Sequence, residues 1–183
     1  FNLNQKFSVP LIVTPGDNDW LDCKREAAGA FNEYERLEYF RQIFYPKRGF
    51  STGGKPMELS QQSEGADFSE FVENSLWEYE SIVFAAVHVV ALTSPATDPA
   101  QKIKRDNAAA AWITNAFRLA KEKGSKGIFL AVQADPWILS GPRSLARRLC
   151  GECMDPRPTL AWLYPLLIEP VSYTHLRAHE TFA

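Results

Sequence analysis

The chain of 183 residues is 45% hydrophobic, and its formal net charge at pH 7 is −2. This length favours one domain with a sizeable apolar core, and this charge gives no electrostatic footprint for nucleic acid. The sequence has no run of about 18 apolar residues, so it predicts no transmembrane helix.

The first part of the chain predicts a buried strand, an amphipathic helix and a long surface loop. Residues 9–13 form a short apolar run that leads into a Pro-Gly pair, which is typical of a strand that stops at a tight turn. Residues 32–45 carry apolar side chains at three- and four-residue spacing, and the following proline ends this helix. Residues 47–67 are rich in Gly, Ser, Gln and Lys, which favours a surface loop.

The second part predicts a strand–helix–strand unit. Residues 81–92 are almost continuously apolar, as in a strand buried on both faces, and residues 126–133 form the next strand. Between them, Asp98 caps a long helix over residues 100–123, and Gly124 ends it. This order predicts a parallel strand pair in an α/β fold. The remaining predicted elements are strands over residues 70–74 and 76–79 and short helices over residues 142–149 and 159–168, the last interrupted or kinked near Pro165.

Polar side chains follow two of the predicted strands. They are Asp17, Asn18, Asp19, Asp22, Gln133 and Asp135. Ligands of open α/β sheets bind at the carboxyl ends of strands, and oxygen donors suit hard divalent cations. The sequence therefore predicts a metal or phosphate site at these strand ends. A solvated turn is the alternative, because Asp and Asn are ordinary turn residues.

The string from Pro15 to Cys23 resembles the signature loop of a subgroup of the calcineurin-like metallophosphoesterases, which reads Gly-Asp-Asn-Glu/Asp-Trp-x-Asp-Cys. The stretch Gln133-Ala134-Asp135-Pro136 is similar to a second loop of that subgroup. The resemblance implies a partial α/β sandwich of the metallophosphoesterase type, with incomplete sheets flanked by helices. It also implies a two-metal site for divalent metal ions and a phosphorylated small-molecule or other ester substrate.

The resemblance assigns roles to individual residues. Asp17 stands where the superfamily has a metal-ligating Asn, Asn18 where it has a phosphate-contacting His, and Asp19 matches the closing acid. Gln133 stands where the superfamily has a metal-ligating His, and Asp135 is a further candidate ligand. The expected metal ligands are therefore Asp17, Asp19, Gln133 and Asp135. Asn18 is the expected catalytic residue, although an amide cannot act as a general acid near neutral pH.

The superfamily uses further metal motifs that this sequence does not contain outside the loop from Pro15 to Cys23. They are an Asp-x-His near the first strand, a Gly-Asp after the second, a later single His and a Gly-His-x-His near the end. We therefore expect a fragment of a metal-dependent phosphoesterase that hydrolyses phosphomonoesters or phosphodiesters and is inactive in this form. The alternative is a non-catalytic phosphoesterase-like binding domain.

The end of the chain resembles translated sequencing-adapter read-through. We therefore expect a phosphoesterase-like domain over residues 1–170 and a non-native tail over residues 171–183. His175 and His179 fall in this tail. The remaining histidine, His88, lies in an apolar run and is predicted to be a satisfied buried residue rather than a ligand.

Cys150 and Cys153 form a C-x-x-C pair. The sequence lacks a second pair for a zinc site, and the cysteines follow a helical pattern rather than precede one. A local disulfide or two idle thiols is the expected outcome, and a redox pair is the weaker alternative.

Overall fold

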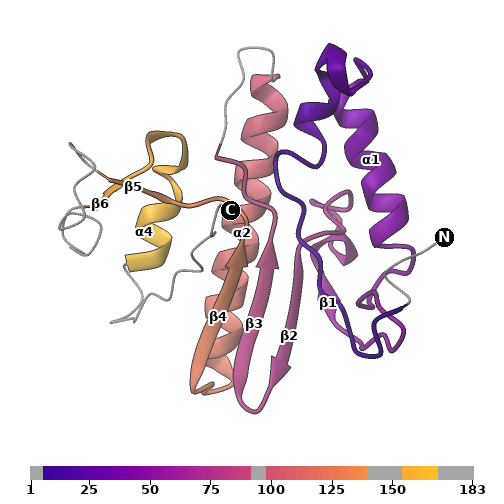
Figure 1. Cartoon of the computed structure of the whole chain (residues 1–183). Helices are drawn as coiled ribbons and strands as arrows, with labels where there is room; N and C mark the ends of the chain where they lie inside the picture. The colour runs from indigo at the N-terminus through magenta and orange to yellow at the C-terminus, as the bar shows by residue number, and fades with distance from the viewer. Residues whose placement is uncertain (1–5, 92–97, 140–153, 169–183) are drawn as a thin grey trace.

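The computed structural model describes residues 6–91, 98–139 and 154–168, and it combines helices with a mixed sheet in an α/β arrangement (Figure 1). The strands are β1 Ser60–Gln61, β2 Ser75–Tyr79, β3 Ile82–Val87, β4 Gly127–Val132, β5 Trp137–Leu139 and β6 Met154–Pro156. The α-helices are α1 Glu33–Phe44, α2 Pro99–Glu122 and α4 Leu163–Ile168. Short 3-10 helices are η2 Leu21–Lys24, η3 Glu26–Ala28, η4 Gln62–Glu64 and η6 Pro158–Leu160.

The main sheet has the strand order β1-β2-β3-β4, and β5 pairs separately with β6. Strands β1, β2 and β3 are antiparallel, whereas β3 and β4 are parallel, with Val83 opposite Ile128. The connection from β3 to β4 includes α2, which packs along the sheet (Figure 1). The predicted strand–helix–strand unit is therefore confirmed.

The two long helices begin and end at the residues that the sequence indicates. Asp98 caps α2, because its Oδ1 accepts a hydrogen bond of 2.9 Å from the amide of Ala100. Gly124, with φ +62°, adopts the left-handed conformation just beyond the end of α2. Asn32 caps α1 in the same way, with Oδ1 3.0 Å from the amides of Tyr34 and Glu35.

One face of the sheet packs against α2 and forms the main core. The core side chains alternate along β3 and recur at helical spacing on α2, as both periodicities require. They include Val83, Ala85 and Val87 from β3 and Ala109, Trp112, Ile113 and Ala116 from α2. The prediction that β3 is buried on both faces holds for Ala85, Ala86 and Val87, whereas Phe84 is half-buried.

The opposite face carries an aromatic row across three neighbouring strands. The rings of Trp77 and Phe84 are stacked with centroids 5.3 Å apart, and Phe129 follows at 5.7 Å from Phe84. Phe129 is 51% exposed. Among the described residues, a helix therefore covers only one face of this part of the sheet.

Two predicted strands are wrong. Residues 9–13 form no strand, and Leu11 makes a single antiparallel bridge to Thr52. Pro10 has no amide hydrogen for a strand ladder, which limits regular pairing there. Residues 70–74 form turns, and the side chains of Glu73 and Asn74 are buried there in hydrogen bonds with Arg41 and Gln62. These contacts with residues distant in sequence leave no local signal.

Two further predictions need revision, and a third concerns residues that the structure does not describe. The predicted surface loop over residues 47–67 contains β1 and η4, and Gln61, Gln62 and Ser63 are buried. Residues 159–168 contain the end of η6 and then α4, and Pro165 lies in the first turn of α4, where a proline is tolerated. The predicted helix over residues 142–149 lies outside the described residues, as do Cys150, Cys153, His175, His179 and the tail.

Candidate functional site

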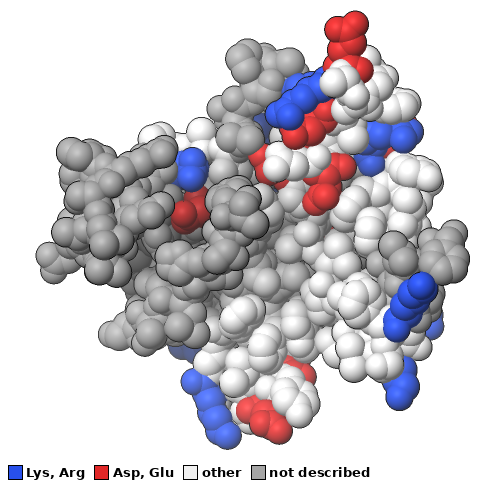
Figure 2. All heavy atoms as spheres, in the orientation of Figure 1, with Lys and Arg blue, Asp and Glu red and all other residues white. Residues whose placement is uncertain are grey.

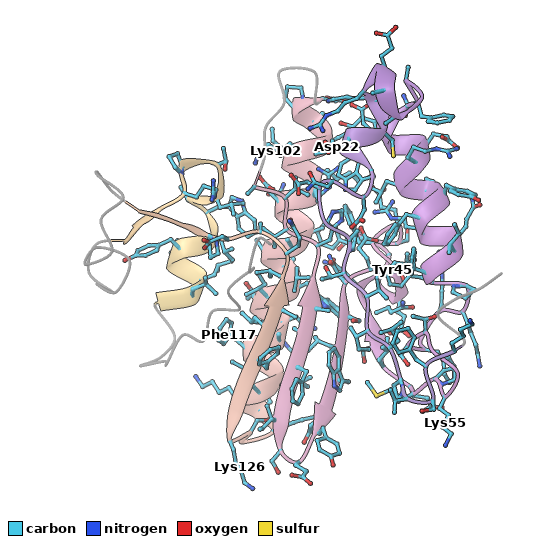
Figure 3. All side chains as sticks on the ribbon, viewed as in Figure 1. Asp22, Tyr45, Lys55, Lys102, Phe117 and Lys126 are labelled. Atoms are coloured by element: carbon cyan, nitrogen blue, oxygen red, sulfur yellow. The ribbon has the colours of Figure 1, made fainter. Side chains whose placement is uncertain are left out.

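The turn that begins at Gly16 is attached to the carboxyl end of β3. Thr14 Oγ1 donates to the carbonyl of Val87, the last residue of β3, over 3.4 Å. Tyr45, located where α1 ends (Figure 3), donates its hydroxyl to the Val13 carbonyl over 2.7 Å. These two side chains fix the end of the segment in which a strand was predicted beside the carboxyl end of β3.

The three polar residues after Gly16 have different surroundings. Asp19 Oδ2 accepts a hydrogen bond of 2.8 Å from the Gly16 amide and so closes the turn. Asp17 is 6% exposed, and no side chain or amide in the described residues bonds to its carboxylate. Asn18 is exposed. The turn therefore offers one buried carboxylate and one accessible amide.

Gln133 directly follows β4, and its side chain packs against the Gly16 turn. A Cβ added at Gly16 would lie 3.0 Å from Gln133 Cγ, so the turn and the end of β4 are in close contact. The two strand-end segments singled out in the sequence thus lie side by side. Asp135 is exposed and farther along, and its carbonyl accepts a hydrogen bond of 2.8 Å from Arg157 Nε.

The donors at this edge suit a hard divalent cation in kind, because they are carboxylate and amide oxygens. Their number is smaller than such a cation needs. Across residues 6–91, 98–139 and 154–168, no group of three or more His, Cys, Asp and Glu side chains is arranged to hold a metal ion. The described residues therefore fit part of a metal site and do not complete one.

Beneath this turn lies a buried ionic cluster that sequence reasoning missed. Glu73, fully buried, accepts hydrogen bonds from Arg41 Nε and Nη2 at 3.0 and 2.7 Å. Glu73 Oε1 also lies 2.9 Å from His88 Nδ1, so that nitrogen carries the hydrogen. His88 is therefore buried and hydrogen-bonded at Nδ1, as predicted, but its Nε2 has no partner in the described part of the chain.

Burial and hydrogen bonding set the protonation of this cluster. Burial alone would raise the pKa of the Glu73 carboxyl, but the hydrogen bond from His88 and the charges of His88 and Arg41 outweigh it and lower that pKa to about 2. Burial also lowers the pKa of His88 from its usual value, against the opposing effect of Glu73. At neutral pH, Glu73 is therefore ionised.

Trp20 links the cluster to the turn. Its side chain is fully buried, and its ring centroid lies 5.9 Å from those of His88 and Tyr34. The guanidinium carbon of Arg105 lies 4.7 Å from the Trp20 ring centroid. The residue that ends the Gly16 turn is therefore part of the interior rather than of an open binding surface.

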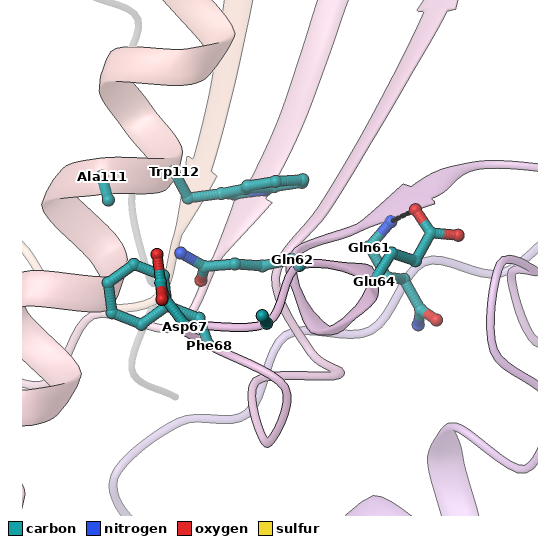
Figure 4. Close-up of a pocket in the computed structure, with 9 residues that line it drawn as sticks. Gln61, Gln62, Glu64, Asp67, Phe68, Ala111 and Trp112 are labelled. Carbon is teal, nitrogen blue, oxygen red and sulfur yellow. Dashed lines mark hydrogen bonds between the residues drawn. The ribbon is translucent and has the colours of Figure 1, made fainter.

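A hollow in the described part of the chain lies away from this turn. It has a volume of about 470 Å³ and is open to solvent. Figure 4 shows Ala111 and Trp112 of α2 on one side and Asp67 and Phe68 of the loop on the other. Gln62, which lines it, is already hydrogen-bonded to Asn74 and to the Ala108 carbonyl. None of the predicted site residues lines this hollow.

Among the described residues on the face in Figure 2, acidic and basic side chains are interspersed. No helix in the described residues is both long and apolar enough to cross a membrane.

Searches against protein-family models, curated proteins and solved structures find no match to this chain.

Proposed function

We propose that this chain forms part of a metal-dependent phosphoesterase of the metallophosphoesterase α/β-sandwich type, acting on phosphomonoesters or phosphodiesters. The observation that supports it is the packing of Gln133 against Gly16 beside the carboxyl ends of β3 and β4. Ligands of open α/β sheets bind at such a place. The resemblance of both segments to metallophosphoesterase loops gives this edge its chemical class.

The proposal gives each residue at this edge one role. The buried Asp17 carboxylate ligates a divalent metal ion, Gln133 and Asp135 supply further oxygen atoms, and Asp19 holds the turn through the Gly16 amide. The exposed Asn18 amide donates to a phosphate oxygen. When bound, divalent metal ions polarise a phosphoryl oxygen and activate a water molecule. The proposal requires metal ligands beyond the described residues.

A second function is favoured by the neutral side chains in this set. Asn18 and Gln133 are amides, which cannot exchange a proton with a substrate near neutral pH. A phosphoesterase-like domain with these residues is suited to binding a phosphorylated molecule without turnover. Metal dependence separates the two functions, because only the first requires it.

The test is binding of Mn²⁺ to the purified chain by calorimetry, together with metal-stimulated hydrolysis of an aryl phosphate. We expect Mn²⁺ binding that Asp17→Ala abolishes, because the substitution removes the buried carboxylate. Asp22→Ala is the matched control, since Asp22 lies in the same segment and pairs with Arg25 at 2.8 Å. We expect no hydrolysis above the Asp17→Ala background, because the described ligands do not complete a metal site.

Each outcome bears on the proposal. Equal Mn²⁺ binding by the chain and by Asp17→Ala overturns the assignment of Asp17. Phosphate binding without any effect of Mn²⁺ favours the non-catalytic domain. Robust hydrolysis that Asp17→Ala abolishes supports an enzyme whose metal site is more complete than the described residues.

A further inference from the structure

The buried stripe of α2 contains one charged residue. The buried positions of this helix are Arg105, Ala108, Ala109, Trp112, Ile113 and Ala116. Arg105 is 5% exposed, although Arg is rarely buried without a partner. Its position on this stripe follows from helical periodicity, so α2 carries it into the interior together with the apolar side chains.

Arg105 has no ion pair with any described residue, in contrast to Arg41. Its Nε is fully buried without a hydrogen bond, and its guanidinium lies over the Trp20 ring at 4.7 Å. The one fully buried carboxylate nearby, Glu73, is already bonded to Arg41 and His88. Arg41 thus has two carboxylate partners, Glu73 and Glu38, whereas no carboxylate of the described residues pairs with Arg105.

This arrangement opposes stability in the absence of an anion. A buried guanidinium without a carboxylate pays a desolvation penalty that a cation–π contact offsets only in part. Burial accordingly lowers the pKa of Arg105. The planar guanidinium is suited to paired hydrogen bonds with oxyanions, above all carboxylate and phosphate.

The position of Arg105 connects this charge to the Gly16 turn. Arg105 contacts Trp20, which follows Asp19 directly, and the Tyr34 ring centroid lies 5.9 Å from that of Trp20. We propose that Arg105 is a binding residue for an oxyanion of the phosphate class at the base of the Gly16–Trp20 turn. Its assignment to a phosphoester substrate rests on the proposed function, whereas binding of the oxyanion itself requires no metal.

The experiment measures the thermal midpoint of the full chain in chelator, with inorganic phosphate or with chloride at equal ionic strength. The variants are Arg105→Met, which removes the charge, and Arg105→Lys, which keeps a charge without the planar fork. Arg118→Met is the matched control, because Arg118 lies on the same helix, is exposed and pairs with Glu122. Asp17→Asn shows whether the effect depends on the proposed metal ligand.

We expect phosphate to raise the midpoint of the wild type, of Arg118→Met and of Asp17→Asn, since ligands stabilise the state that binds them. Arg105→Met should lose this shift, and its midpoint in chloride should equal or exceed that of the wild type. Arg105→Lys should bind phosphate about tenfold more weakly. If Arg105→Met does not fold, the phosphate affinity of Arg105→Lys relative to the wild type tests the inference instead.

Absence of a phosphate shift in the wild type overturns the inference, as does an unchanged shift in Arg105→Met or unchanged affinity in Arg105→Lys. An Arg105-dependent shift without Mn²⁺ binding leaves the inference standing and removes the proposed metal function. Mn²⁺ binding that requires Asp17, without a phosphate shift, supports the proposed metal function and overturns the inference on Arg105.

Discussion

Arg41 and Glu73 form a buried ion pair with two hydrogen bonds, at 3.0 and 2.7 Å, between α1 and the segment that precedes β2. Both side chains are at most 8% exposed. The pair therefore joins two parts of the chain that are far apart in sequence, and it lies under the turn that carries Asp17. Removal of one partner leaves the other charge buried.

Glu73→Gln should lower the free energy of unfolding by about 3–5 kcal/mol, because Arg41 loses its buried counter-charge. Urea denaturation measures this change. Glu78→Gln is the control, since Glu78 pairs with Lys123 on the surface, and its loss should cost about 0–1 kcal/mol. Similar effects of the two substitutions would show that the buried pair contributes no more than a surface pair.

Stability should fall with acid in two overlapping ranges of pH. The folded pKa of Glu73 is about 2, below its usual 4.5, so its contribution is present above pH 4.5 and is lost as the pH falls toward 2. The folded pKa of His88 lies below its usual 6.5, so the unfolded chain takes up protons first and stability declines as the pH falls below 6.5. The two contributions have the same sign.

Urea denaturation at a series of pH values tests this dependence. Glu73→Gln should flatten the curve between pH 4.5 and pH 2, because the substituted amide does not titrate. If the free energy of unfolding falls equally steeply between pH 4.5 and pH 2 in the wild type and in Glu73→Gln, the loss does not come from Glu73.

Gly53→Ala should lower the free energy of unfolding by about 1–3 kcal/mol, because φ at Gly53 is +97° and a Cβ would lie 2.4 Å from the Val9 carbonyl oxygen. The bridge between Leu11 and Thr52 lies beside this contact. Gly65→Ala is the control, since its new Cβ meets only ordinary contact at 3.5 Å. Chemical denaturation compares the two, and an unaltered Gly53→Ala variant would argue against this close approach.

The turn between β2 and β3 should be open to stabilisation. Glu80 and Ser81 have φ of +49° and +66°, and Tyr79 pairs with Ile82, so this two-residue turn demands positive φ at both positions. Asn-Gly is the sequence that such hairpin turns favour. Glu80→Asn combined with Ser81→Gly should raise the free energy of unfolding by about 1 kcal/mol, as thermal denaturation will measure. Ser81→Ala retains the Cβ and should give no gain.

Local sequence signals predict the fold where the structure depends on neighbouring residues. Asp98, Gly124 and the apolar periodicity between them suffice for α2, and the apolar runs on either side suffice for β3 and β4. Residues 9–13 carry a strand-like pattern, but a pattern does not specify a pairing partner. That part of the fold depends on contacts with residues distant in sequence.

The candidate site divides in the same way. The strand-end positions of Asp17 and Gln133 are readable from the order of the elements, and the two segments do lie together. The pairing of Glu73 with Arg41 spans 32 residues and leaves no local signal. For Arg105 a signal exists, because a charged residue occupies the apolar stripe that continues through Ala109, Trp112 and Ala116.

In the described chain the main sheet ends at β4, and beside that edge the rings of Phe84 and Phe129 lie on the face away from α2. An edge strand presents unpaired amides and carbonyls, and such an edge readily accepts a strand from another molecule. An adjoining aromatic surface adds apolar area to the same encounter. For the described part of the chain, we therefore expect association through this edge to increase with protein concentration, even at a temperature at which the fold is stable.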